Sequence, residues 1–439
     1  MSSKTKTSRE ANDDGPRPKP PVISLKSFHG QLYSAEQVAV DSTISKLESS
    51  LKIYGCVCVP VSDLGLKGSD MLSACYDRAE KFFTLDKENK MAFTEEEATR
   101  KGYYGSCFTP LGKEPAYIEG QRQRVESFSC TRPLPKESCS HLQGVWKFHK
   151  NLFPDLLVPG FGDAIGTVFE AMREYVAMPM LAALEIMLSL PRGFLTCRSM
   201  ERSSMNMSLL RVLRYTPQET DKADEEVTGR DMLLMPEVGI SEHTDFEVVT
   251  VMHQDMEGLS LRQPGEGGNW FEMPSRPDVL TVILGDMMEH WTGGWLQATP
   301  HRVSSPSPGC SPRKSLVLFQ AHDDMVVVEP LWGDHTGEED LIGQKDMPLR
   351  RKRRRTEQAA GQQRQTSKKS IRRGGKQVHH VVSIEERASM HTAVSTAGPD
   401  WAQGTAWKNM SYTPITQGEW VTGKEGKAQA ALLGPALVS

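Results

Sequence analysis

The sequence predicts a mainly β protein, a β-sandwich or jelly roll, flanked by α-helices that come mostly from the N-terminal half. From Met205 onward, short strand-like runs are separated by Gly, Pro, Asn and Asp. Helical patterns precede this region and do not alternate with its runs, which argues against a parallel α/β sheet. The runs are MSLLRVLRY (207–215), FEVVTVM (246–252), LSLRQP (259–264), WFEMP (270–274), DVLTVILGD (278–286), QATPHRV (297–303), RKSLVLFQA (313–321) and DMVVVEPL (324–331).

The N-terminal half predicts helices around a few strands. Residues 20–28, PPVISLKSF, are expected to form a short opening strand, and Ser42 to Lys52 a helix that is followed by the strand YGCVCVPV. Met71 to Phe83 has apolar residues at helical spacing, as does the longer stretch from Phe161 to Leu190. We expect this second helix to be kinked at Pro179, because proline lacks the amide hydrogen that a helix interior needs.

The chain is long enough for one large domain or two ordinary ones, with 439 residues of which 38% are hydrophobic. We predict a disordered tail over 1–20, a helix-containing N-terminal region over 21–200 and the jelly-roll core over 205–332. A low-complexity basic insertion over 333–408 and a C-terminal segment over 409–439 follow.

The net charge of −4 conceals an asymmetry. Between Arg350 and Lys376 there are twelve Lys or Arg and one Glu, so the rest of the chain carries a net charge of −15. An acidic body argues against a nucleic-acid-binding domain, which normally has a basic face. The basic segment is interpreted as a solvated insertion, and four alternatives stay open: a nuclear localisation signal, a nucleic-acid contact, an acidic-partner contact or a retained intron-derived segment.

The start of the chain is polar and rich in proline, without the apolar stretch of a signal peptide, and no run approaches the roughly 18 apolar residues of a membrane span. The eight cysteines contain no C-x-x-C pair, which favours reduced thiols and gives zinc little support. We therefore predict a soluble, cytoplasmic monomer without membrane contact. The basic run 350–355 makes the nucleus the alternative location.

The segment SEHTDFEVVTVMHQD, residues 241–255, contains the pattern His-x-Asp twice. A His and an Asp two residues apart on a strand point to the same side, so either pair could supply two ligands to one metal ion. The pair His243 and Asp245 follows a loop and precedes a strand, whereas His253 and Asp255 end that strand. Ten extended residues place the pairs as much as roughly 30 Å apart, so only one pair can belong to a given mononuclear site.

A third ligand is needed, and His301 lies 56 residues after Asp245 on another strand of the same region. Two histidines and one carboxylate form the facial triad that leaves three positions open on iron(II) for oxygen chemistry. His290 is the rival third ligand, but it lies in a connection rather than at the start of a strand.

An anion-binding group follows the third histidine. Arg313 and Ser315 are two residues apart and share a strand face, and Tyr215 ends the strand SLLRVLRY. A guanidinium and a hydroxyl suit a carboxylate, which they bind by charge-assisted hydrogen bonds. Tyr215 could add a phenol to the same anion. Arg211 shares the face of Tyr215 and could be structural.

HTD…ATPHRV…RKS, together with GDMMEHWTGGWLQATPHRV, LLRVLRYTP and YTPITQGEW, resembles the 2-oxoglutarate/iron(II)-dependent dioxygenases of the isopenicillin N synthase-like family. Similarity extends to PPVISL, YGCVCVPV, AEKFF and GYYG, so it covers most of residues 20–332 and 409 to about 425. The resemblance implies a double-stranded β-helix and iron ligation by His243, Asp245 and His301. It places His253 on a variable position, so that HQD is a coincidence.

The resemblance further implies that Arg313, Ser315 and Tyr215 hold the distal carboxylate of 2-oxoglutarate. The expected cofactors are Fe(II), 2-oxoglutarate and dioxygen, with ascorbate as a further candidate. The enzyme would hydroxylate or desaturate a small molecule and release succinate and CO2. The alternatives are a related oxidase that does not use 2-oxoglutarate and a catalytically silent binding protein. No residue identifies the substrate, although Gly102 to Pro110 and Phe319 are expected to line its pocket.

Overall fold

The computed structural model describes part of the chain, and the described residues belong to a unit formed by Met1–Thr336 and Gly404–Ser439. The predicted tail up to residue 18, the basic run 350–355 and most of the C-terminal segment lie outside the described residues. The described residues are 19–29, 37–114, 117–118, 121–132, 150–199, 208–217, 237–323, 326–328, 331 and 415–416.

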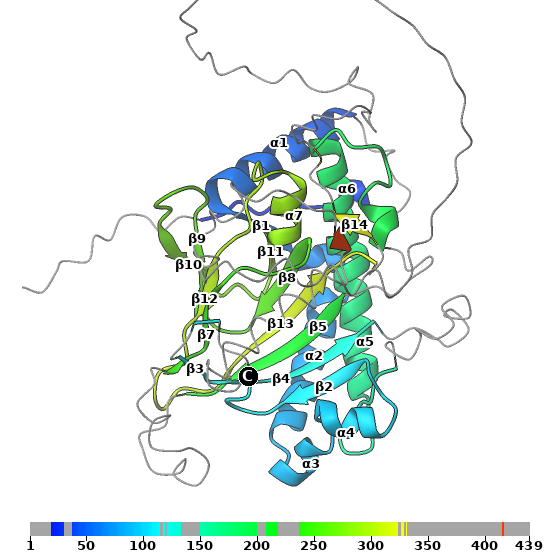
Figure 1. The fold of residues 1–439 in the computed structure, drawn as a ribbon, viewed down its shortest axis with the longest axis vertical. Helices are drawn as coiled ribbons and strands as arrows, with labels where there is room; N and C mark the ends of the chain where they lie inside the picture. Colours follow the sequence, from blue (N-terminus) through cyan, green and yellow to red (C-terminus); the bar gives the residue numbers. More distant parts are fainter. Residues whose placement is uncertain are drawn as a thin grey trace, which may run out of the picture. The chain divides into compact units, whose positions relative to one another are not determined.

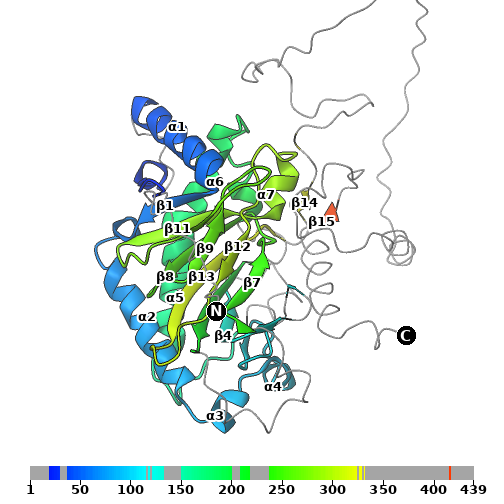
Figure 2. The same ribbon diagram turned by 90° about the vertical axis from the view of Figure 1, so that its left-hand side faces the viewer.

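Two antiparallel sheets form the centre of this unit, which confirms the predicted jelly roll (Figures 1 and 2). The main sheet has the strand order β1-β11-β8-β13-β5-β4-β2, and the minor sheet has the order β10-β9-β12-β7. The main-sheet bounds are Cys56–Pro60, Val279–Leu284, Val249–Gln254, Arg313–Gln320, Leu209–Tyr215, Val125–Thr131 and Ser106–Thr109 in that order, and the minor-sheet bounds are Trp270–Glu272, Leu259–Arg262, His301–Val303 and Ile240–His243.

One apolar cluster fills the space between the sheets, because side chains alternate between the two faces of a strand. Leu213 and Met252 of the main sheet contribute to it, as do Leu261 and Val303 of the minor sheet. A few polar side chains interrupt this cluster, and they belong to the candidate site.

Helices cover the other face of the main sheet. Figure 1 shows the minor sheet on the left, the main sheet in the middle, and α5 and α6 on the right. Their buried side chains form a second apolar cluster with β4, β5, β8 and β13. The helices are α1 (Gln37–Tyr54), α2 (Gly68–Phe83), α3 (Lys87–Met91), α4 (Glu95–Arg100), α5 (Phe161–Met172), α6 (Met178–Met187) and α7 (Asp286–Trp291), with shorter helical turns η1 (Lys26–Phe28), η2 (Val61–Leu64) and η6 (Thr196–Ser199).

A kink was predicted at Pro179; the structure has a π-helical turn, η5 (Arg173–Ala177), between α5 and α6, and Pro179 lies in the first turn of α6. Pro179 cannot donate to the carbonyl of Tyr175, one turn earlier. That carbonyl instead accepts a hydrogen bond from His29 Nε2 at 2.9 Å. The irregular turn therefore begins before the proline, and its open carbonyl is satisfied by a distant side chain.

Other boundaries differ from the sequence predictions. The opening strand at 20–28 is wrong, since Val22 makes only an isolated parallel bridge with Cys58 and a helical turn follows. The run 324–331 contributes only β14 (Val327–Val328), which pairs with β15 (Ile415–Thr416). Strands β2 and β4 and helix α7 were not predicted. The remaining strands are β3 (Arg122–Gln123) and β6 (Glu237–Val238), a parallel pair.

Phe82 lies at the centre of the second apolar cluster. Its ring is fully buried and lies within 6 Å, centroid to centroid, of five other phenylalanine rings: Phe83, Phe93, Phe108, Phe128 and Phe161. Phe82→Ala should therefore lower the free energy of unfolding by about 3–5 kcal/mol. Leu66→Ala, at a fully exposed side chain, is the matched control. Denaturant titration measures both, and a loss below about 1 kcal/mol for Phe82→Ala would contradict this packing.

Candidate metal centre and active site

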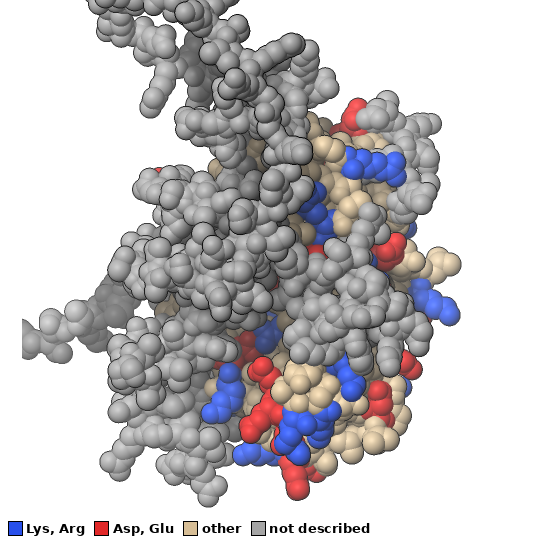
Figure 3. All heavy atoms as spheres, turned by 45° about the vertical axis from the view of Figure 1, so that its right-hand side comes forward, with Lys and Arg blue, Asp and Glu red and all other residues tan. Residues whose placement is uncertain are grey.

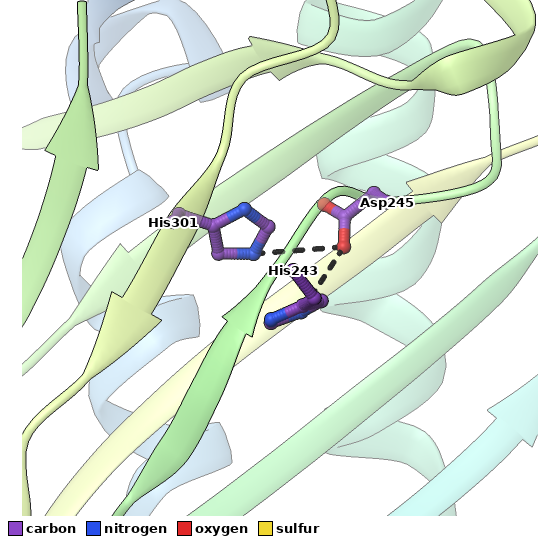
Figure 4. Close-up of side chains that lie close together, drawn as sticks. All are labelled: His243, Asp245 and His301. Atoms are coloured by element: carbon purple, nitrogen blue, oxygen red, sulfur yellow. Dashed lines mark ion pairs between the residues drawn. The ribbon is translucent and has the colours of Figure 1, made fainter. Parts of the chain in front are cut away.

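The three predicted metal ligands come together between the two sheets (Figure 4). His243 ends β7, Asp245 follows it, and His301 begins β12, where it is the register partner of His243. Asp245 Oδ1 lies 3.7 Å from His243 Nε2 and 3.6 Å from His301 Nε2. One ligand atom of each residue lies within 4.8 Å of the others, as one metal ion requires.

Backbone carbonyls fix the tautomer of both imidazoles. His243 Nδ1 lies 2.8 Å from the carbonyl oxygen of Ser241, and His301 Nδ1 lies 3.0 Å from that of Thr299. A carbonyl oxygen only accepts, so each Nδ1 carries the hydrogen. Each Nε2 then presents its lone pair toward Asp245, the arrangement that metal-binding histidines adopt.

Asp245 is oriented by a hydroxyl on the neighbouring strand. Thr250 Oγ1 donates to Asp245 Oδ2 at 2.5 Å, which leaves Oδ1 turned toward the histidines. Gly285 also matters, because a Cβ there would collide with the carbonyl of Glu247 in the loop that carries Asp245. The backbone of this loop is further held by the amide of Asp286, which donates to the Asp245 carbonyl at 2.8 Å.

Burial shifts the pKa of two of the three residues, His243 and Asp245. Burial and the neighbouring His301 hold the pKa of His243 well below its usual value, so its imidazole is neutral. Burial raises the pKa of Asp245, because its carboxylate charge is poorly solvated. A divalent cation beside it would reverse that effect. The donor set of two imidazoles and one carboxylate fits iron(II).

Thr250→Val should weaken iron(II) binding by about 10–100-fold, since it removes the hydroxyl that orients Asp245. This hydroxyl lowers the pKa of Asp245, so its loss raises that pKa further. Protons then compete with iron at higher pH, and the midpoint of iron loss should move upward from that of wild type. Iron titration across pH measures both effects. Thr281→Val, on β11, is the control; equal iron affinity in the two variants would refute the role of Thr250.

The predicted anion clamp lines the same cavity as the metal ligands. Arg313 begins β13 opposite Tyr215, and Ser315 lies two residues further on the same face. The Arg313 guanidinium carbon lies 4.7 Å from the centre of the Tyr215 ring. All three residues are at most 4% exposed. Burial raises the pKa of Tyr215, so its phenol keeps the proton that it could donate.

One nitrogen of this buried guanidinium has no partner. Arg313 Nη2 donates to Gln254 Oε1 at 2.7 Å, and Nε donates to the Met256 carbonyl at 3.2 Å. Nη1 is buried and makes no hydrogen bond within the described part of the chain. An unsatisfied buried cation is costly, so an anion is the group that this end of the cavity lacks. A carboxylate is an anion that a guanidinium binds by charge-assisted hydrogen bonds.

His253 and Asp255 do not join the metal-capable group. His253 Nδ1 lies 2.9 Å from the Tyr76 hydroxyl, and its Nε2 lies 3.2 Å from the Pro277 carbonyl, so both ring nitrogens are engaged. Asp255 Oδ1 accepts from the amide of Lys314 at 2.7 Å. His290, the rival third ligand, is buried in α7 and is likewise outside the group.

Several residues of the cavity were not predicted from the sequence, and some of the predicted ones lie elsewhere. Phe319 lines it as expected, but none of the residues from Gly102 to Pro110 does; they lie at the β2 edge of the main sheet. Glu114 and Tyr117 line it instead, and the Tyr117 ring stacks on that of His243, with centroids 4.3 Å apart. Gln254, which accepts a hydrogen bond from Arg313, also lines the cavity. The sequence pattern around Gln254 does not distinguish it from its neighbour His253.

The chain is similar in sequence to known iron- and 2-oxoglutarate-dependent oxygenases. Residues 207–322 match the family model described as the 2OG-Fe(II) oxygenase superfamily. The 2-oxoglutarate-dependent dioxygenase traH of Penicillium crustosum is 26% identical over 327 residues, which cover 73% of this chain and 90% of the relative.

Solved structures share the fold. The full-length T7H of Neurospora crassa, in complex with alpha-KG, has a TM-score of 0.54 at 20% identity and covers 73% of this chain and 90% of its own. A 2OG-Fe(II) oxygenase family protein of Caulobacter crescentus has a TM-score of 0.54 at 22% identity, with 71% and 89% covered. None of the described helices has the length and apolar character needed to cross a bilayer.

Proposed function

We propose that this chain, a member of the 2OG-Fe(II) oxygenase superfamily, oxidises a small molecule by hydroxylation or desaturation. It is a non-haem iron dioxygenase that uses iron(II), 2-oxoglutarate and dioxygen. In this proposal His243, Asp245 and His301 bind the iron, while Arg313, Ser315 and Tyr215 hold the distal carboxylate of 2-oxoglutarate. Ascorbate is proposed as an accessory reductant.

The observation that carries the proposal is the orphaned Nη1 of Arg313 in the cavity that the three metal-capable residues also line. A site for metal alone needs no buried guanidinium. A site for 2-oxoglutarate needs an anion clamp at the end of the molecule away from the iron, together with open positions on the metal.

The protein residues position the reactants and exclude water. When bound, iron(II), 2-oxoglutarate and dioxygen supply the oxidant for an unactivated C–H bond, and 2-oxoglutarate leaves as succinate and CO2. His243 and His301 keep their Nε2 lone pairs toward the metal because Nδ1 is held by the backbone. Arg313 fixes the far end of the cosubstrate, and the apolar walls, which include Leu259 and Val317, keep the cavity dry.

Production of succinate tests this function. Purified protein with iron(II) should consume oxygen and form succinate only when 2-oxoglutarate is supplied, at a slow uncoupled rate even without substrate. Oxygen consumption that does not depend on 2-oxoglutarate would indicate the oxidase alternative, and no consumption with iron fully bound would indicate the silent protein. Neither alternative is favoured by relatives such as traH, named a 2-oxoglutarate-dependent dioxygenase, and ppzD, named a 2-oxoglutarate-Fe(II) type oxidoreductase.

We also propose the domain division predicted from the sequence. In it, the insertion 333–408 separates the catalytic core, residues 205–332, from the C-terminal segment. The family match ends at residue 322, which supports a boundary beyond it. Deleting residues 345–400 should leave the melting temperature and the decarboxylation of 2-oxoglutarate nearly unchanged, because the segment is polar and of low complexity. Thermal melts of both forms decide this; a drop of many degrees or loss of iron would show that the segment stabilises the core.

A cytoplasmic monomer without nucleic-acid or membrane partners is part of the proposal. A nucleic-acid-binding surface is expected to be positively charged. On the described part of one face, Lys and Arg are interspersed with Asp and Glu (Figure 3). Size-exclusion chromatography with light scattering tests the monomer, and a mass of two chains would contradict it.

A further inference from the structure

A second arginine lines the cavity and has an open donor. Arg211 lies on β5, where its Nε donates to Ser129 Oγ at 3.1 Å. Its Nη2 donates to Glu114 Oε2 at 2.8 Å and to Ser127 Oγ at 3.1 Å. None of these three hydrogen bonds uses Nη1, and the residue contributes to the cavity wall. Nη1 is therefore a donor available to a bound molecule.

The position of Arg211 separates it from the anion clamp. It is four residues from Tyr215 along β5 and pairs with Val317, whereas Tyr215 pairs with Arg313. Four residues of strand correspond to roughly 13 Å. The distal carboxylate of 2-oxoglutarate, held at the Arg313 end, does not reach Arg211, so this donor serves a different molecule.

Two aromatic rings accompany Arg211 near the metal ligands. Tyr117 stacks parallel on His243, and Phe319 lies on β13 two residues beyond Val317, the register partner of Arg211. Both rings line the cavity and neither is fully buried. They provide apolar surface of the kind that accepts a flat, conjugated molecule.

The charges of the complete site cancel. With iron(II) and 2-oxoglutarate bound, the positive charges of iron(II), Arg211 and Arg313 would be matched by Asp245, Glu114 and the two carboxylates of 2-oxoglutarate, since a histidine that ligates a metal is uncharged. A charged substrate would add an uncompensated charge to a buried site, which is unfavourable. The single open donor of Arg211 suits a carbonyl oxygen.

We propose that Arg211, Tyr117 and Phe319 form the substrate subsite, and that Arg211 Nη1 donates a hydrogen bond to a carbonyl oxygen of an uncharged, aromatic or conjugated substrate. This inference rests on the proposed function, since it assigns the substrate class of the same cavity. Glu114 orients the Arg211 guanidinium by accepting from Nη2. Because its carboxylate already pairs with this guanidinium, a carboxylate substrate would not bind there.

Three probes of one shape test the substrate class. Acetophenone has the ring and the carbonyl, ethylbenzene lacks the oxygen, and benzoate carries a charge. Each is titrated into the anaerobic iron(II)–2-oxoglutarate protein, and binding is followed by the change in the charge-transfer absorption and by the shift in melting temperature. Acetophenone should bind at least about tenfold more tightly than ethylbenzene or benzoate. It is the one probe that accepts a hydrogen bond from Arg211 Nη1 without adding a charge to the site. Equal binding of ethylbenzene, stronger binding of benzoate, or no binding of acetophenone would overturn the proposal.

Variants separate recognition from a structural role of the ion pair. Arg211→Met combined with Glu114→Gln leaves no buried carboxylate unpaired, and it should abolish the preference for acetophenone over ethylbenzene. Glu114→Gln alone should raise the affinity for benzoate about tenfold, since it frees Arg211 for an acid. Arg214→Met is the matched control, because Arg214 lies on the other face of β5 and pairs with Glu126. If the double variant still preferred acetophenone to ethylbenzene, the Arg211–Glu114 ion pair would have only a structural role.

The outcomes also distinguish this inference from the proposed function. If 2-oxoglutarate gives no charge-transfer band, the proposed function fails, and the melting-temperature shifts still report whether acetophenone is preferred. If the band forms and Arg211→Met weakens 2-oxoglutarate rather than acetophenone, Arg211 belongs to the cosubstrate site and the inference is wrong.

Discussion

Asp245→Ala should abolish tight iron(II) binding, and His243→Ala and His301→Ala should do the same. Each change removes one of three converging ligand atoms, so the loss of affinity should exceed the roughly 10–100-fold that follows removal of a residue supporting a ligand. Metal analysis of protein dialysed against a weak chelator measures the iron retained per chain.

His253→Asn and His290→Ala are the matched controls, because both histidines are buried and neither joins the metal-capable group. Both variants should retain iron at the wild-type level. Loss of iron in His290→Ala together with retention in His301→Ala would show that the third ligand has been assigned to the wrong residue.

Arg313→Ala should weaken 2-oxoglutarate binding by about 10–100-fold while it leaves iron(II) affinity nearly unchanged. A charge-assisted hydrogen bond to a carboxylate contributes about 1.5–3 kcal/mol, and Arg313 lines the cavity without being one of the three metal-capable residues. Arg313→Lys should restore only part of the affinity, because an ammonium keeps the charge but loses the planar fork that Gln254 orients.

Lys314→Ala is the control for this change, since Lys314 is adjacent in sequence but pairs with Glu80 at 2.9 Å, outside the cavity. Anaerobic titration separates the dissociation constants of iron and 2-oxoglutarate for each variant. If Arg313→Ala bound 2-oxoglutarate as tightly as wild type, another residue would have to hold the distal carboxylate.

The sequence predicted the elements whose residues repeat with a clear period. The core strands are short apolar runs bounded by Gly, Pro, Asn or Asp, and β8 and β11 are buried at every position. His301, the proposed third ligand, starts another strand of the core. The short strand β2 gave no clear signal, because one of its two buried residues is the polar Ser106, which leaves Phe108 as its one buried aromatic side chain. α7 has six residues, too few to show a helical period.

The candidate ligands were predictable because they are close in sequence or stand at strand starts, whereas the rest of the cavity depends on distant contacts. Glu114 meets Arg211 across 97 residues, and Tyr117 reaches His243 from a different part of the chain. The orientation of Asp245 by Thr250 is local, yet a threonine on a strand is too common to indicate a function. Only the folded chain brings these partners together.

The most direct test of the central claim is an anaerobic titration of the iron(II) protein with 2-oxoglutarate, followed by visible absorption. The arrangement of His243, Asp245 and His301 beside the Arg313 clamp predicts a metal-to-ligand charge-transfer band that saturates at one 2-oxoglutarate per iron. A protein that binds iron fully at these residues but develops no such band would contradict its assignment as a 2-oxoglutarate-dependent dioxygenase.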